Sequence, residues 1–228
     1  MPADLKNFAP RARPPRETME GRFVRLEPLD ADRHGDDLYA ASTVSDAEQR
    51  FAGLSDYPPK TREEYSDWLA KAEASTDPMH FAVIDRKSGK VGGRQTFMRI
   101  DQKNGVVEIG NIYWGPLISR TPVTTEALYL FARCAFDDLG YRRFEWKCNN
   151  TNAASKSAAE RFGFAYEGLF RQHMIVKGKN RDTAWFSMLD SEWPANRKAF
   201  EGWLDPSNFD SEGRQKRRLE EIRADIAG

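Results

Sequence analysis

The sequence is poor in cysteine, in long apolar runs and in excess charge of either sign. Its 228 residues include only Cys134 and Cys148, too few for a disulfide scaffold and without the C-x-x-C spacing of a zinc or redox site. The longest apolar run, residues 127–132, is far shorter than the roughly 18 residues that predict a membrane span. Because 35 basic residues balance 35 acidic ones, no overall field attracts nucleic acid or an anionic membrane. We therefore expect a cytoplasmic protein without metal, nucleic-acid or membrane partners.

Aromatic residues are abundant, and they predict a folded domain with a sizeable core. The chain contains 14 Phe, 7 Tyr and 6 Trp, too many for a disordered segment. Residues 1–19 are rich in proline and arginine, lack the apolar centre of a secretory signal, and predict a flexible arm. Residues 20–204 form the expected single domain, and residues 205–228 form a charged tail or helix.

Hydrophobic periodicity predicts alternating helices and strands along the domain. Period-two segments predict strands, and apolar residues three or four apart predict helices. Thr61, three residues before Glu64, forms a capping box at a helix start. In chain order the expected elements are a strand at 22–26, helices at 31–52 and 61–74, strands at 81–84, 91–100 and 106–114, a helix at 122–139, a strand at 143–148, a helix at 153–162, strands at 166–176 and 182–189, and a helix at 194–204. This order indicates an α/β (α+β) fold.

The segment 108–128 joins a strand to a helix in a form that suits an anion. Thr121 followed by Pro122 is typical of a helix N-cap and a first helical position. Unpaired N–H groups and the helix dipole favour a phosphate at such an end. An ordinary helix cap explains the same residues, so both interpretations stay open.

A second strand-to-helix junction spans residues 148–164. Asn152 is placed to cap the helix, and Gly163 is placed to end it in the left-handed conformation. Between Arg142 and Arg181 nine residues are basic and three are acidic, a local excess that an anionic cofactor would favour. A solvated charged face is the simpler explanation. A nucleic-acid-binding surface is a third, although no recognition motif accompanies it.

Together these segments resemble the GNAT (GCN5-related) acetyltransferases, and within them the branch of the ribosomal-protein alanine N-acetyltransferases. The matching residues are Glu108-Ile109-Gly110, Trp114, Pro116, Thr125-Glu126-Ala127-Leu128, Asn152, Ser155, Glu160, Gly163-Phe164, Glu167-Gly168 and Arg181-Asp182. The resemblance covers residues 21–192 and includes the order of the elements. It implies a GNAT fold, which is a mixed, mostly antiparallel central sheet with splayed strands 4 and 5 and helices on both faces.

The resemblance implies that acetyl-CoA binds between the splayed strands and that no metal takes part. The strand ending at Trp114 would pair with the pantetheine arm, and a backbone N–H near Trp114 would polarise the thioester carbonyl. Backbone N–H groups between Ser119 and Thr125 would hold the pyrophosphate. The full set of expected cofactor-binding residues is Trp114, Leu117, Ser119, Arg120, Thr121, Val123, Thr124, Thr125, Asn152, Ser155, Lys156 and Arg161.

Two departures from the family pattern bear on the cofactor site. The family's phosphate loop has a glycine where this chain has Pro122, which removes one backbone donor. A hydrogen bond to a charged group is worth about 1.5–3 kcal/mol, whereas micromolar affinity requires about 8 kcal/mol from the whole site, so the other amides can still suffice. The stretch 108–116 is one residue longer than in the family, which predicts a bulge in that strand.

Four residues are candidates for the chemistry. Glu108 is the first choice of general base, directly or through water, and His173 is the second. The family's tyrosine acid corresponds to Ala159, which leaves Ser155 as the nearest replacement, while Trp114 contributes its backbone N–H. Structural roles explain Glu108 equally well and His173 better, so the identity of the base stays open.

The resemblance implies an acetyl-CoA-dependent N-acetyltransferase in which a primary amine attacks directly within a ternary complex. The acceptor is a small-molecule amine or a peptide or protein N-terminal α-amine, and a homodimer is left open. Holding an α-amine neutral at pH 7 costs ~1–1.4 kcal/mol, against ~4.6 kcal/mol for a lysine side chain. A catalytically weak acyl-CoA-binding or regulatory protein is the alternative, because the family's tyrosine and one loop donor are missing.

Overall fold

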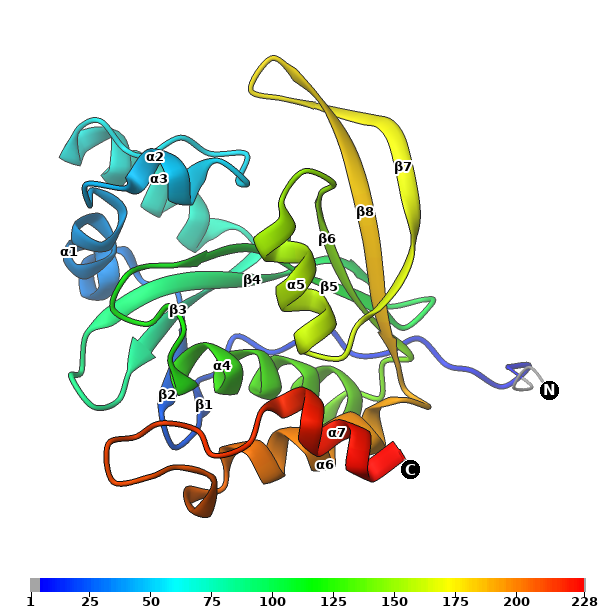
Figure 1. Cartoon of the computed structure of the whole chain (residues 1–228). Coiled ribbons are helices and arrows are strands. Elements are labelled where there is room, and N and C mark those ends of the chain that lie inside the picture. Colours follow the sequence, from blue (N-terminus) through cyan, green and yellow to red (C-terminus); the bar gives the residue numbers. More distant parts are fainter. Residues whose placement is uncertain (1–4, 228) are drawn as a thin grey trace.

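An eight-stranded sheet forms the centre of the protein in a computed structural model that describes residues 5–227 (Figure 1). The strands are β1 (Met19–Glu20), β2 (Val24–Pro28), β3 (Met79–Asp85), β4 (Val91–Asp101), β5 (Val106–Trp114), β6 (Arg143–Asn149), β7 (Ala165–Val176) and β8 (Lys179–Leu189). Their order across the sheet is β1-β2-β3-β4-β5-β6-β8-β7. Only β5 and β6 pair in parallel among these strands. The predicted mixed, mostly antiparallel sheet is confirmed.

Helices cover both faces of the sheet, as expected (Figure 1). On one face lie α1 (Ala31–Ser42), α2 (Ala47–Phe51) and α3 (Arg62–Ala74). On the other lie α4 (Pro122–Arg133), α5 (Ala153–Arg161), α6 (Trp193–Leu204) and α7 (Leu219–Ala227), with a π-helical turn at Cys134–Asp138 and a 3₁₀ turn at Pro206–Asn208. Within residues 5–227, no helix is both long and apolar enough to cross a membrane.

Strand alternation divides the core into two layers. Phe81 and Val83 of β3 point to the face covered by α4, where they join the larger apolar cluster. Ala82 and Ile84 point to the opposite face and pack in the smaller cluster with residues of α1 and α3. All four side chains are buried, so β3 is a central strand with helices on both sides.

The parallel pair β5–β6 stays in register for only four residues. Val106–Ile109 lie opposite residues 143–146, and beyond them the two strands diverge. On its other side β5 contains the predicted bulge, because Tyr113 pairs with Arg94 and Gly110 pairs with Thr96, which leaves one extra residue on β5. Asn111, inside the bulge, has a φ of 47°. The fourth and fifth predicted strands, 106–114 and 143–148, are β5 and β6 here because the short strand β1 was not predicted. Both the splay and the bulge are therefore confirmed.

Two predicted helices are shorter than their periodicity suggested. The single helix expected at 31–52 is wrong, because Thr43 ends α1 with its hydroxyl hydrogen-bonded to the Tyr39 carbonyl, and a second helix begins after Asp46. The helix expected at 122–139 ends its α-helical part at Arg133 and continues as the π-helical turn. Hydrophobic periodicity cannot predict either a local side-chain hydrogen bond or a change of helical pitch.

Both expected tails lie against the domain where the structure describes them. Residues 5–18 form no helix or strand, but the Arg11 amide donates to the Gln102 carbonyl, Tyr141 donates to the Ala12 carbonyl, and Pro14 is buried. Residues 1–4 of the expected arm and residue 228 lie outside the described residues, and the flexibility of the arm stays a prediction. The C-terminal segment ends in α7, whose Leu219 is buried against α6.

We expect Phe131→Ala to lower the free energy of unfolding by about 3–5 kcal/mol, because it empties a large space in the core. The Phe131 ring is fully buried, stacks on Phe97 with centroids 3.8 Å apart, and meets Phe81 edge-on at 5.3 Å. Urea denaturation measures the loss. The control Ile175→Ala removes an 83% exposed side chain and should change stability by less than about 0.5 kcal/mol. Equal stability of the two variants would contradict the assignment of this core.

Candidate active site

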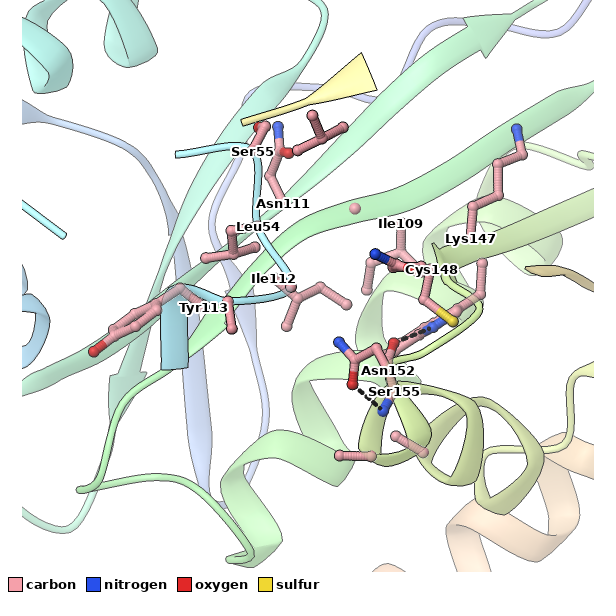
Figure 2. A pocket seen from close by; sticks show the side chains of 18 of the residues that line it. Leu54, Ser55, Ile109, Asn111, Ile112, Tyr113, Lys147, Cys148, Asn152 and Ser155 are labelled. Carbon is pink, nitrogen blue, oxygen red and sulfur yellow. Dashed lines mark hydrogen bonds between the residues drawn. The ribbon is translucent and has the colours of Figure 1, made fainter. Parts of the chain in front are cut away.

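A cleft of about 650 Å³ opens where β5 and β6 diverge. Its walls come from β5, from β6, from the start of α5 and from the segment 52–55 that follows α2. In Figure 2, Ile112 of β5 lies across the cleft from Asn152 and Ser155, and Ile109 lies beside Cys148, where the two strands are still close. The wedge between the strands is therefore open and is lined from both sides.

The backbone of Trp114 faces this cleft. The Gly115 amide donates to the Gly92 carbonyl on β4, so strand alternation turns the preceding amide, that of Trp114, toward the opposite edge of β5. That edge has lost its partner, because β6 pairs with β5 only as far as Ile109. The Trp114 ring is fixed by a 3.3 Å hydrogen bond to Gln95. A rigid strand thus presents a backbone donor to the wedge.

Several backbone N–H groups of the loop before α4 already donate to acceptors within the loop. The Ser119 amide donates to the Gly115 carbonyl, the Thr121 amide to the Ile118 carbonyl, and the Val123 amide to the Thr121 hydroxyl, while Pro122 has no amide hydrogen. Ser119 also donates from its hydroxyl to the Trp114 carbonyl. Thr124 is the remaining first-turn residue, and helix geometry gives its amide no intrahelical acceptor. Thr121 is confirmed as the N-cap of α4.

The other expected cofactor residues lie at different distances from the cleft. Trp114, Ser119, Asn152 and Ser155 line it, whereas the lining does not include Leu117, Arg120, Thr121, Val123, Thr124, Thr125, Lys156 and Arg161. These lie in the loop before α4, on α4 and on α5. Leu117 is 47% exposed on the loop, and Arg120 has a φ of 61°.

Helix α5 brings its first turn to the cleft. The Asn152 side chain caps the helix by accepting from the Ser155 amide at 3.0 Å, and Gly163 follows its end with a φ of 91°, as predicted. The Ser155 hydroxyl oxygen accepts a 3.0 Å hydrogen bond from the Trp146 indole (Figure 2). Burial raises the pKa of the neighbouring Cys148 thiol, so this cleft residue is a neutral thiol at pH 7.

The two basic candidates on α5 point to different partners. Lys156 donates to the Asn150 side chain at 3.3 Å. Arg161 donates to the Thr125 hydroxyl at 3.1 Å and thereby places a positive charge beside the first turn of α4. Its guanidinium lies over the rings of Phe162 and Trp203, each 5.1 Å from the centroid. Of the two, Arg161 is the residue closer to the expected phosphate position.

Glu108 is a buried carboxylate in the floor of the cleft. Its Oε2 lies 2.9 Å from the Lys147 ammonium and 3.4 Å from Arg99 Nε. Lys147 also contacts Glu145 Oε2 at 2.6 Å and lies 3.7 Å above the Trp185 ring. Burial raises the pKa of Glu108 above its ordinary value, and the Lys147 charge opposes that rise. A carboxylate with a raised pKa is a better proton acceptor than an exposed one.

His173 does not line the cleft, unlike its neighbour Met174. The His173 Nδ1 atom lies 2.9 Å from the Thr183 hydroxyl, and the ring packs against Phe170 and Trp185. Burial lowers the pKa of His173, and nearby Arg99 contributes to the shift. The structure thus separates the two candidate bases and brings only Glu108 to the wedge.

A buried arginine that the sequence analysis missed holds one wall of the cleft in place. The Arg94 guanidinium donates to Asp56 at 2.7 Å and to the Asn111 carbonyl at 3.1 Å, and it lies 4.3 Å over the Trp68 ring. Asp56 immediately follows the lining segment 52–55. This contact therefore ties that segment to β4 and to the β5 bulge. Arg94 lies among glycine, glutamine and threonine in its strand, so the local sequence gives no signal of its role.

Comparison with known proteins decides the family. The model of the acetyltransferase (GNAT) domain matches residues 24–165. The chain belongs to the GNAT acetyltransferase family. A crystal structure of a GCN5-related N-acetyltransferase from Brucella melitensis superimposes with a TM-score of 0.95 at 63% identity, covering 96% of this chain and 100% of that one.

Two curated proteins are more distant relatives. The uncharacterized N-acetyltransferase p20 of Bacillus licheniformis is 31% identical over 117 residues, which are 50% of this chain and 63% of that protein. YdaF of Bacillus subtilis strain 168, a candidate ribosomal N-acetyltransferase, is 29% identical over 110 residues, which are 48% of this chain and 59% of that protein. The matched region thus spans about three fifths of the length of each curated relative.

We expect His80 to make the protein acid-sensitive below pH 6.5. Burial, with the Arg94 charge, lowers the pKa of His80 from 6.5 to about 4. As the pH falls, His80 is protonated in the unfolded chain before it is protonated in the folded protein. The free energy of unfolding therefore drops between pH 6.5 and 4 by up to about 3 kcal/mol. Urea denaturation at pH 7.5 and 4.5 should show a steeper loss for the natural protein than for His80→Gln. Parallel losses in both proteins would contradict this assignment.

Proposed function

We propose that the protein is an acetyl-CoA-dependent N-acetyltransferase acting on a primary amine through a ternary complex. The observation that carries the proposal is the open wedge between β5 and β6, which has a backbone donor on one wall and the buried carboxylate of Glu108 in its floor. An extended thioester lying in the wedge would place its carbonyl beside the donor and leave the carboxylate for the attacking amine. Membership of the GNAT family supports the same reaction.

The cofactor would be held by main-chain groups along its length. The pantetheine arm replaces the missing strand partner of β5, and the Trp114 amide stabilises negative charge on the thioester oxygen. The pyrophosphate lies at the first turn of α4, where the dipole and the Thr124 amide favour an anion. Arg161 adds a positive charge beside Thr125. This arrangement compensates for the donor lost at Pro122.

The acceptor amine would lose its proton to Glu108, directly or through one water. Attack forms a C–N bond to the acetyl carbon, and collapse of the tetrahedral intermediate breaks the C–S bond. Ser155 is suited to protonate the departing thiolate, because its oxygen accepts from the Trp146 indole while its hydroxyl hydrogen, which lies beside the Cys148 sulfur, is the group that donates. Since an α-amine is more easily held neutral than a lysine side chain, the site favours amines of low basicity.

Isothermal titration with acetyl-CoA, together with a thiol-release assay on a panel of amines and peptides, tests the proposal. Saturable binding and amine-dependent release of coenzyme A are expected. Binding without release for any amine would favour the alternative of an acyl-CoA-binding or regulatory protein. Absence of binding would overturn both.

Replacing Arg161 with Met should weaken acetyl-CoA binding by ~10–150-fold, because one charge-assisted contact to a phosphate is lost. Isothermal titration gives the affinity directly. Arg133→Met is the matched control, since Arg133 lies in the last turn of α4, at the opposite end of that helix from the proposed phosphate position. An unchanged affinity for Arg161→Met would remove this residue from the cofactor site.

Replacing Glu108 with Gln should lower kcat by ~10²–10⁴-fold while leaving the affinity for acetyl-CoA unchanged, because only proton transfer is lost. Glu145→Gln is the matched control: it neutralises the other carboxylate on Lys147 but does not line the cleft. We expect a much smaller loss there. Equal losses in the two variants would show that Glu108 acts only through the charge balance around Lys147.

A further inference from the structure

Arg181 lies on β8 near the tip of the hairpin formed by β7 and β8, where it pairs with Met174, and its guanidinium has no partner among the described residues. Its Nε atom is buried and has no hydrogen-bond partner, and within residues 5–227 its side chain makes no ion pair. Burial lowers the pKa of Arg181, while the charge of Glu108 opposes this. An arginine with buried, unsatisfied donors is costly unless something accepts from them. The structure therefore leaves a cation here without an internal partner.

Arg181 stands at the junction of two cavities. It lines the cleft that contains Glu108, and it also lines a second cavity of about 540 Å³. The two cavities share Asn149 and Val176 in their walls as well. A molecule whose amine reaches Glu108 can therefore extend past Arg181 into the second cavity.

The tip of the hairpin closes one side of this second cavity. Lys177 donates its ammonium to the Phe51 carbonyl at the end of α2, with 2.8 Å between the two atoms. The same ammonium lies 4.6 Å from the centroid of the Tyr57 ring. These contacts join the tip of the hairpin to α2 and to the segment that follows it, along the wall of the second cavity.

The charges around the two cavities favour an anion. Six basic and three acidic side chains line them, on a protein whose net charge is zero. Glu108 already has Lys147 and Arg99 as partners, and Asp182 accepts from the Gln172 amide. The third acid, the exposed Glu48, lies on the second cavity, where Arg181 and the exposed Lys179 supply two positive charges against its one negative charge.

We propose that Arg181 recognises an anionic group, a carboxylate or a phosphate, on the acceptor molecule whose amine is acetylated. The guanidinium matches either oxyanion with a bidentate pair of hydrogen bonds. The amine then points to Glu108 and the remainder of the acceptor lies in the second cavity. Small amines that carry an acidic group fit this arrangement, whereas a peptide N-terminus followed by basic residues meets like charge. The inference rests on the function proposed above.

Binding of acetylated products tests the inference without requiring turnover. We would titrate the protein–coenzyme A complex with N-acetyl-β-alanine, with N-acetyl-2-aminoethyl phosphate and with neutral N-acetyl-β-alaninamide. The acetylated nitrogen carries no charge in any of them, so differences report the other end of the molecule. At least one anionic product should bind about tenfold or more tightly than the amide, and the tighter anion shows whether carboxylate or phosphate is preferred.

Variants test whether Arg181 is responsible for the preference for anionic over neutral products. Arg181→Met should abolish it, Arg181→Lys should retain part of it because the charge remains, and Arg171→Met on exposed β7 should leave it intact. Inorganic phosphate should compete with the anionic products on the natural protein, which requires no variant to fold. Equal binding of anionic and neutral products, or a preference that survives in Arg181→Met, would overturn the inference. Failure of coenzyme A to bind in a separate titration would instead count against the proposed function.

Discussion

The divergence of β5 from β6 is the constraint on which the site depends. Two parallel strands that pair for four residues and then separate leave the edge of β5 beyond Ile109 without a strand partner along the cleft. An unpaired strand edge presents backbone donors and acceptors, so it suits an extended ligand with groups to match. The bulge at Asn111 on the other side of β5 adjusts the direction of the strand without breaking its pairing with β4. Geometry of the main chain, more than any single side chain, creates the cleft.

Charged side chains on β5 and β6 stabilise the Glu108 carboxylate in that cleft. Glu108 and Glu145 lie opposite one another in the β5–β6 register, and Lys147 bridges them. Burying one of these acids alone would cost several kcal/mol, whereas the shared ammonium makes the group tolerable. Lys147 is in turn held over the Trp185 ring, so its position is fixed from β8. The proposed base therefore sits in a prepared environment instead of depending on solvent.

The sequence predicted what local patterns determine and missed what distant contacts determine. Thr121 and Asn152 could be predicted as the caps of α4 and α5 because neighbouring residues set them, whereas the extra residue in β5 was predicted from the resemblance to the family. The bond between Arg94 and Asp56 joins residues 38 positions apart, and no period or motif marks it. The sequence equally could not show that Met174, and not His173, would face the cleft, because the register shift between Phe170 and Met174 alters which side chains point inward.

The C-terminal helices give the cofactor end of the cleft a support that the loop alone lacks. Three amides of the loop before α4 are already bonded within it, and Pro122 has none, so a phosphate there would rely on fewer donors. Arg161 adds charge at that point, and Trp203 of α6 lies against its guanidinium. Arg223 of α7 donates to the Arg161 carbonyl at 3.0 Å, which fixes the backbone from which that side chain extends. The charged tail thus packs on its own domain and fixes the backbone of the residue that we propose to contact the cofactor phosphate.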